Sequence, residues 1–249
     1  MKISVIIPIK NQAEKLLKNL KDKILPYFDS CGVTYEVIIA PNGFDADQKE
    51  ILSKGMEQMP AQVRLLPFLE EGGKGRGARY GILASEADYD LIMDADCATD
   101  LRAFDLIKPD LGKYDAFVAN RDLPESYQNK RPFLRRMGHK VSIWLVRKKF
   151  GFHDIGDTQC GYKCYRHSMA VAMVKKQTIM GYAYDVEHCY FITLNHFSVK
   201  EIPVHWENDE AGTSVSFFSS SKAFSKDLKR IKKNKQSYIL TEEERKAIC

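Results

Sequence analysis

Two aspartates near the middle of the chain have the types and spacing that most directly suggest chemistry. Asp94 and Asp96 follow the apolar run Leu91-Ile92-Met93, and residues two apart in an extended strand point to the same side. Two such carboxylates can provide oxygen ligands for one hard divalent cation, Mg²⁺ or Mn²⁺, with phosphate oxygens and water completing the coordination. An acidic turn after a strand has the same pattern, so the surrounding sequence must decide between a metal site and a turn.

A glycine-rich segment lies upstream of these aspartates. Residues 72–79 read Gly-Gly-Lys-Gly-Arg-Gly-Ala-Arg, which fits neither the Walker pattern nor the dinucleotide-binding fingerprint. Kinases and Rossmann dehydrogenases therefore lose their main support. The segment still suits close backbone approach and an anion at a helix N-terminus, with Lys74 and Arg79 as cations. A plain loop is the alternative.

The elements that must position these residues follow an alternating pattern. Short β-rich runs alternate with amphipathic stretches, which predicts an α/β protein with an open sheet and helices on both faces. The expected strands are 3–9, 35–40, 63–68, 89–93, 116–119 and 199–204, and the expected helices are 13–28, 47–59, 76–85, 131–150, 168–175 and 184–195. Ligands of such sheets bind outside the carboxyl ends of the strands, where Asn11, Asn42, Asp94 and Arg121 fall.

The length and charge pattern bound the organisation of the chain. A chain of 249 residues with 44% hydrophobic residues suits one core, so we expect a catalytic domain over 1–218 and a basic polar tail over 219–249. Residues 128–151 contain eight basic residues and no acid, and residues 222–235 contain seven against one acid. Both segments carry apolar residues at helical spacing, among them Trp144 and Leu145, which suits an anionic membrane surface. A core-facing helix with a solvated back, followed by a frayed tail, is the alternative.

Further motifs lie downstream and make the pattern specific. They are the run Asp-Thr-Gln-Cys-Gly-Tyr-Lys at 157–163, the Asp-Val-Glu at 185–187, and the strand Ile-Pro-Val-His-Trp at 202–206. Together with Val-Ile-Ile-Pro at 5–8, Asn11, the Gly-Lys-Gly loop and Asp-x-Asp, they resemble family-2 glycosyltransferases of the GT-A fold. Within that family the chain is most similar to dolichyl-phosphate and polyprenyl-phosphate glucosyltransferases, over residues 1–216.

The resemblance implies a Rossmann-like mixed sheet and a role for each matching residue. The nucleotide-sugar donor would be bound by Pro8, Asn11, Asn42, Lys74, Arg79, Asp94 and Gln159. The metal, Mg²⁺ or Mn²⁺, would be held by Asp94 and Asp96, and the catalytic residues would be Asp157, Asp185 and Glu187. The family usually inverts the anomeric centre.

Three departures from the family pattern bear on the donor and the membrane. Pro41-Asn42 replaces a common acidic pair that reads the base, although Asn42 can still pair with uracil through its donor and acceptor. Lys10-Asn11-Gln12 replaces the usual aromatic-Asn-Glu. No apolar run reaches the roughly 18 residues of a bilayer span, so we expect a cytoplasmic protein peripherally bound to the cytoplasmic face of a membrane.

The acceptor can be inferred from what it requires of the protein. A sugar hydroxyl needs a general base, for which Asp157 or Asp185 is the candidate, whereas a lipid phosphate is already an anion and needs cations. The acid-free basic segment favours a lipid phosphate, held by Arg121, Arg131 and Arg135. We therefore expect transfer of a hexose, glucose, from a UDP-sugar to a polyprenyl or dolichyl phosphate. Transfer to a hydroxyl of a cell-surface polysaccharide and, more remotely, a sugar nucleotidyltransferase are the alternatives, and no nucleic-acid partner is expected.

Overall fold

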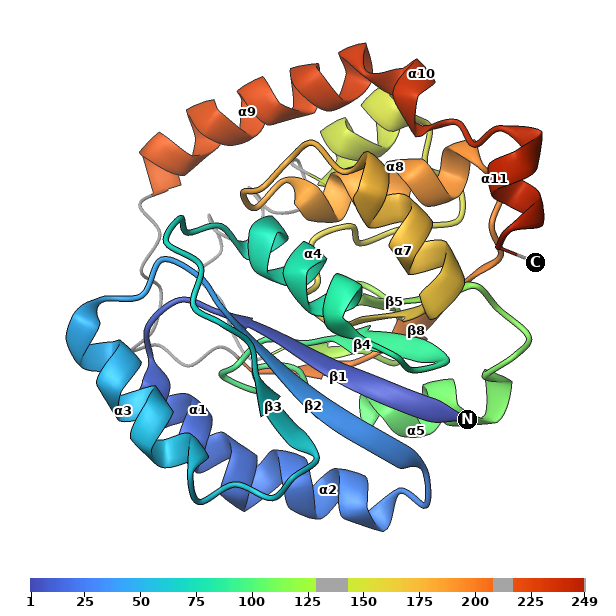
Figure 1. The fold of residues 1–249 in the computed structure, drawn as a ribbon. Helices are drawn as coiled ribbons and strands as arrows, with labels where there is room; N and C mark the ends of the chain where they lie inside the picture. The colour runs from blue at the N-terminus through green and yellow to red at the C-terminus, as the bar shows by residue number, and fades with distance from the viewer. Residues whose placement is uncertain (129–142, 208–216, 249) are drawn as a thin grey trace.

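A seven-stranded sheet forms the centre of the molecule (Figure 1). The computed structural model describes residues 1–128, 143–207 and 217–248, with side chains from residue 223 onward in the last range. The strand order is β3-β2-β1-β4-β7-β5-β8, and a second sheet pairs β6 with β9. The strands are β1 (Lys2–Ile9), β2 (Thr34–Pro41), β3 (Val63–Leu65), β4 (Tyr89–Ile92), β5 (Ala116–Asn120), β6 (Tyr127–Gln128), β7 (Lys163–Arg166), β8 (Val199–Pro203) and β9 (His205–Trp206).

The sheet is mixed because of one strand that the sequence did not predict. β1, β2, β3 and β4 are parallel, and β5 is parallel to β8. β7 is antiparallel to both of its neighbours, β4 and β5. Its four residues begin with a lysine and lead directly into a helix, so the pattern lacks the long apolar run of a central strand. The expected α/β fold with an open mixed sheet is confirmed, and all six predicted strands are present.

Helices cover both faces of the sheet (Figure 1). One face is covered by α1 (Ala13–Asn19), a π-helical segment (Leu20–Ile24), α2 (Leu25–Ser30), α3 (Ala46–Met56) and α5 (Ala103–Ile107). The other face carries α4 (Lys74–Ala84), helical residues 143–150, α7 (His167–Lys176), α8 (Tyr184–Leu194), α9 (Phe217–Lys233), α10 (Lys235–Tyr238) and α11 (Glu242–Lys246). The short helix α5 was not predicted from the sequence.

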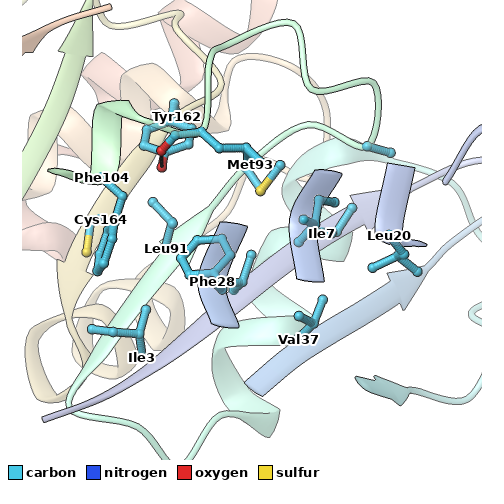
Figure 2. Close-up of a cluster of buried hydrophobic side chains, with 14 of the residues drawn as sticks. Ile3, Ile7, Leu20, Phe28, Val37, Leu91, Met93, Phe104, Tyr162 and Cys164 are labelled. Carbon is cyan, nitrogen blue, oxygen red and sulfur yellow. Dashed lines mark hydrogen bonds between the residues drawn. The ribbon is translucent and has the colours of Figure 1, made fainter. Parts of the chain in front are cut away.

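The core follows the alternation of the strands. Ile3 and Ile7 of β1 point toward the layer of α1 and α2, where Phe28 packs beside them (Figure 2), whereas Ile6 points to the α4 side. Phe28 lies 5.5 Å from the ring of Phe104 in α5. Each such side chain contributes about 1.5–3 kcal/mol when it is fully buried. This packing fixes the strand ends that carry the polar motifs.

The C-terminal segment is not a frayed tail. Ile231, Tyr238 and Leu240 are buried in the cluster that contains α7 and α8. The hydroxyl of Tyr238 donates a hydrogen bond of 2.6 Å to Glu187. The frayed-tail alternative is therefore wrong, because apolar residues at helical spacing dock this segment on the core. The division at residue 218 stays a prediction.

The helix expected over 131–150 is present in the part that the structure describes. Residues 129–142 lie outside the described residues, and residues 143–150 are helical. Here Val146 and Phe150 are buried, whereas Trp144 and Leu145 are 58% and 53% exposed. The core-facing side of this helix therefore holds Val146 and Phe150, whereas Trp144 and Leu145 lie outside the core, as the membrane alternative requires.

Candidate active site

The loops after β1 and β2 meet the start of α4. Asn42 is buried, and its amide nitrogen donates to the carbonyl of Ile9 at 3.1 Å while its amide oxygen accepts from the backbone of Gly73 at 2.8 Å. A Cβ on Gly77 would lie 2.6 Å from the Asn42 amide nitrogen and 2.9 Å from Cβ of Pro8. Only glycine allows α4 to approach this closely. The Asn42 amide, which we expected to face uracil, thus holds the three loops together.

Asn11 lies at the rim of the same strand end. It has a φ of 55°, in the left-handed region that asparagine tolerates better than most residues. Its amide nitrogen donates to the Asp45 carboxylate at 2.8 Å, and its amide oxygen accepts from the Asp45 backbone at 3.0 Å. This reciprocal pair ties the β1 loop to the start of α3. Asp45 was not among the predicted site residues.

The glycine-rich segment leads into α4 and places Lys74 against the first aspartate of the Asp-x-Asp motif. Lys74 Nζ lies 2.5 Å from an Asp94 carboxylate oxygen. Burial by itself lowers the pKa of Lys74, but the carboxylates of Asp94 and Asp185 raise it above its usual value. The lysine is therefore a fixed cation at the carboxyl end of β4. Arg79 lies half-buried five residues further along α4.

Asp96 and Asp94 form the acidic part of the site. Burial, and then the charge of Asp94, raises the pKa of Asp96, so the two carboxylates repel each other in a partly dry environment. A Cβ on Gly161 would lie 2.1 Å from an Asp94 oxygen, so the loop after residue 157 closes directly over Asp94. Paired oxygens of like charge fit a hard divalent cation, which would relieve the repulsion. Among residues 1–128, 143–207 and 217–248, no group of three or more His, Cys, Asp or Glu side chains is positioned to hold a metal.

The Asp157 carboxylate forms an ion pair with an arginine. The Asp157 carboxylate is fully buried and accepts from Arg121 Nε at 2.6 Å and from Arg121 Nη2 at 3.0 Å. Burial by itself lowers the pKa of Arg121, but this carboxylate raises it above the usual value. The guanidinium carbon lies 5.7 Å from the ring centroid of Trp206, and the Gln159 backbone also donates to Asp157 at 3.0 Å. Asp157 is thus placed to orient Arg121.

The two acidic residues of α8 are also paired. Asp185 forms a buried ion pair with Lys163. Burial by itself lowers the pKa of Lys163, but the charge of Asp185 raises it, and the net shift is upward. Glu187 accepts hydrogen bonds from the backbones of Thr178 and Ile179 at 2.8 and 2.9 Å, in addition to that from Tyr238. Glu187 therefore fixes the loop before α8 and the C-terminal segment, as a positioning group.

The predicted residues fall into two connected groups and a remainder. The first joins Pro8, Asn42, Lys74, Asp94 and Asp96, and the second joins Arg121, Asp157 and Gln159, with Gly161 in contact with Asp94 between them. The structure does not bring Glu187 to this edge, and Arg131 and Arg135 lie outside the described residues. Lys163 and Trp206 were missed as site residues. The signals that could have found them are the last residue of the 157–163 run and the aromatic residue that ends the 202–206 strand.

Comparison with solved structures identifies the fold. Glucosyl-3-phosphoglycerate synthase from Mycobacterium tuberculosis, solved with Mn²⁺, UDP-glucose and glycerol 3-phosphate, superimposes with a TM-score of 0.64. The match covers 97% of this chain and 82% of that chain at 13% identity. The mixed sheet and this likeness define the GT-A fold.

The family follows from the sequence. The model of glycosyl transferase family 2 matches residues 4–174, so the chain belongs to that family and is a glycosyltransferase. Dolichyl-phosphate beta-glucosyltransferase from Dictyostelium discoideum is 28% identical over an alignment covering 92% of this chain and 73% of the relative. The proteins of the same name from Homo sapiens and Saccharomyces cerevisiae are 26% and 25% identical, over 87% and 91% of this chain and 71% and 72% of the relatives. Within the part of the chain that the structure describes, no helix is both long and apolar enough to cross a bilayer.

Proposed function

We propose that this chain transfers glucose from UDP-glucose to a polyprenyl phosphate, with inversion and with a divalent metal. The choice of acceptor rests on one observation. Each of the three carboxylates that could act as a base is already ion-paired or hydrogen-bonded. Asp157 is paired with Arg121, Asp185 is paired with Lys163, and Glu187 accepts hydrogen bonds from four donors. A phosphate acceptor needs no base, so a site with paired carboxylates and an oriented arginine suits it.

The donor end of the reaction rests on the strand-end loops. Pro8, Asn11 and Asn42 would border the nucleobase, and Lys74 would receive the diphosphate with support from Arg79. Asp94 and Asp96 would hold the Mg²⁺ or Mn²⁺, because their like charges lie together and phosphate oxygens could complete the coordination. When bound, the metal would neutralise charge on the departing UDP.

The acceptor end rests on Arg121. Its guanidinium, held on one side by Asp157 and by the face of Trp206, would orient the lipid phosphate while Gln159 borders the donor sugar. A phosphate oxygen attacks the anomeric carbon on the face opposite UDP, the carbon–oxygen bond to UDP breaks, and UDP leaves with the electron pair. No proton is transferred. The names of the relatives, dolichyl-phosphate beta-glucosyltransferase, support both the acceptor class and a beta product.

The experiment that tests this function compares acceptors that differ only in the reacting group. Labelled UDP-glucose is incubated in detergent with Mn²⁺ and either a polyprenyl phosphate, the matching polyprenol, or a soluble oligosaccharide. We expect organic-soluble label with the phosphate alone. Transfer to the oligosaccharide, with none to the lipid phosphate, would replace this proposal with a hydroxyl acceptor.

The nucleotide is tested separately by thermal shift. Binding to the folded state raises its stability in proportion to the logarithm of ligand concentration over Kd. Among UDP, GDP, CDP and dTDP with Mn²⁺, UDP should give the largest increase in Tm. A clearly larger shift with GDP would contradict the assignment of the base.

A further inference from the structure

The two basic segments, far apart in the sequence, meet in the folded chain. Lys232 Nζ of α9 donates a hydrogen bond of 2.8 Å to the backbone carbonyl of Lys149, and lies 5.6 Å from the ring centroid of Phe150. Ile231 of α9 and Phe150 belong to the same buried cluster. Figure 1 shows α9 along the outer side of the helical layer on this face. Helical residues 143–150 and α9 therefore share one surface.

This shared surface concentrates positive charge. The described side chains of the two helices, residues 143–150 and 223–233, include eight basic residues and one acid. Burial, and then the charges of Lys229 and Lys232, lowers the pKa of Lys149, so the lysines repel one another across the junction of the helices. Arg147, Lys148, Lys229 and Lys232 are exposed. A partner with many negative charges would relieve this repulsion.

Large apolar side chains lie in the same surface. Trp144 and Leu145 are 58% and 53% exposed, although Ile143 and Val146 on the other side of the helix are buried. Lys148 Nζ lies 5.2 Å from the ring centroid of Trp144. Tryptophan beside lysine is the combination found at membrane interfaces, where the ring enters the headgroup region and the cation meets lipid phosphates.

A hollow beside this surface reaches the residue that follows Arg121. A cavity of about 490 Å³ is lined by Ile143, Trp144 and Phe152 together with Arg147, and its wall includes Asp122. Asp122 directly follows Arg121, the proposed acceptor-phosphate ligand. A hollow that lies between an exposed tryptophan and the neighbour of the acceptor arginine suits a lipid chain that enters from a bilayer.

We propose that Trp144, Leu145, Arg147, Lys148, Lys149, Lys229 and Lys232 form one joined basic surface that docks the protein on an anionic phospholipid membrane. The cations contact acidic headgroups, and Trp144 and Leu145 insert between the headgroups. The link to the acceptor rests on the proposed function, whereas membrane docking itself does not. A nucleic acid would use the charges but would leave Leu145 without a role.

The test is binding of the full chain to vesicles without donor or acceptor. We expect sedimentation with vesicles containing 30% phosphatidylserine at low salt, weak sedimentation with phosphatidylcholine alone, and a steep loss as salt rises. The triple variant Arg147→Gln, Lys148→Gln and Lys229→Gln should lose at least about tenfold in affinity. The matched control removes the same charge from the opposite face, as Lys18→Gln, Lys54→Gln and Lys113→Gln, and should stay within about twofold.

A second measurement reports insertion. Lipids brominated near the headgroup should quench the tryptophan fluorescence of the wild type. Trp144→Phe should lose that quenching, because the remaining tryptophan, Trp206, is not part of the proposed docking surface. Leu145→Ser should weaken binding without changing its dependence on salt.

Three results would overturn the proposal. The first is an equal loss of vesicle affinity in the triple variant and in the control. The second is displacement of the protein from vesicles by millimolar inorganic phosphate at constant ionic strength. The third is tight binding to RNA with no binding to anionic vesicles. Normal transfer to a polyprenyl phosphate in detergent by a protein that ignores vesicles would refute docking and leave the proposed function standing. Binding to vesicles without transfer to a polyprenyl phosphate would refute the proposed function and leave docking standing.

Discussion

The two ends of the central sheet both bury charged groups, but they use them differently. At the amino ends of the parallel strands, the Ser85 hydroxyl donates to the Asp90 carboxylate and lies 2.8 Å from the Ser4 hydroxyl, and Asp90 also contacts His167 at 2.8 Å. At the carboxyl ends, the ion pairs join Lys74 to Asp94, Arg121 to Asp157 and Lys163 to Asp185. Each of these pairs joins groups from different parts of the chain.

The difference lies in what a ligand could reach. Asp90 is completely buried within a strand, and its partners close the network. Lys74 and Asp94 keep 20% and 35% of their side chains exposed, and both belong to loops or helix starts beside the strand ends. Charged groups at the amino end therefore fix the fold, whereas the Lys74–Asp94 pair at the carboxyl end is available to exchange partners when a ligand binds.

The largest expected effect separates the two ends by activity. Asp96→Ala should lower turnover by about a thousandfold or more, because the diphosphate charge of the departing group is then uncompensated. Asp90→Asn, the matched change at the amino end, should lower Tm while leaving kcat of the folded fraction unchanged. Glucose transfer at saturating metal measures the turnover of both variants, and thermal unfolding measures Tm. Full activity of Asp96→Ala, or full activity in excess chelator, would remove the metal assignment.

The next effect concerns the arginine pair. Asp157→Asn should lower kcat/KM for a polyprenyl phosphate by about a hundredfold while UDP affinity stays unchanged, because it frees Arg121 from its orienting partner. Circular dichroism checks that the variant folds, since breaking a buried pair is destabilising. The control Asp115→Asn disrupts the ion pair with Arg166 away from the site and should be active. Loss of the acidic limb in the pH profile of Asp157→Asn would instead identify Asp157 as a proton acceptor.

Lys74 should give two effects of opposite sign. Lys74→Met should weaken UDP-glucose binding about tenfold, because a charge-assisted contact to the diphosphate is lost. The same change should strengthen binding of Mn²⁺ alone, since Lys74 no longer competes for Asp94. Electron paramagnetic resonance of free Mn²⁺ and calorimetry with the nucleotide measure the two affinities. A weaker Mn²⁺ affinity in the variant would show that Lys74 does not compete with the metal.

The smallest effect is a pH dependence of stability at the amino end. The hydrogen bond to Asp90 raises the pKa of His167 above its usual value despite partial burial. Its contribution is therefore complete below the unfolded value of about 6.5 and is lost as the pH rises through the folded value. Urea unfolding at pH 6 and pH 9 should show a larger loss in free energy of unfolding for the wild type than for His167→Gln. Equal losses would mean that the pair contributes no pH dependence.

The sequence predicted the frame of the fold better than the assembly of the site. Regular apolar runs such as 3–9 and 35–40 define strands by themselves, and the residues that follow them were placed at the correct sheet edge. Pairings across the chain, such as Arg121 with Asp157, depend on the order of strands, which periodicity does not contain. The direction of Trp144 was left open because an exposed tryptophan has the same apolar character in the sequence as a buried one.

The position of β7 has a consequence for how the chain is made. β7 lies between β4 and β5, so β4 has an unpaired edge until residues 163–166 have left the ribosome. By the end of that interval, more than half of the chain is synthesised, and β4 still presents an open strand edge, which is a template for pairing with other nascent chains. Synthesis of this protein therefore passes through an aggregation-prone window that closes only with β7, and slow translation between β5 and β7 would widen it.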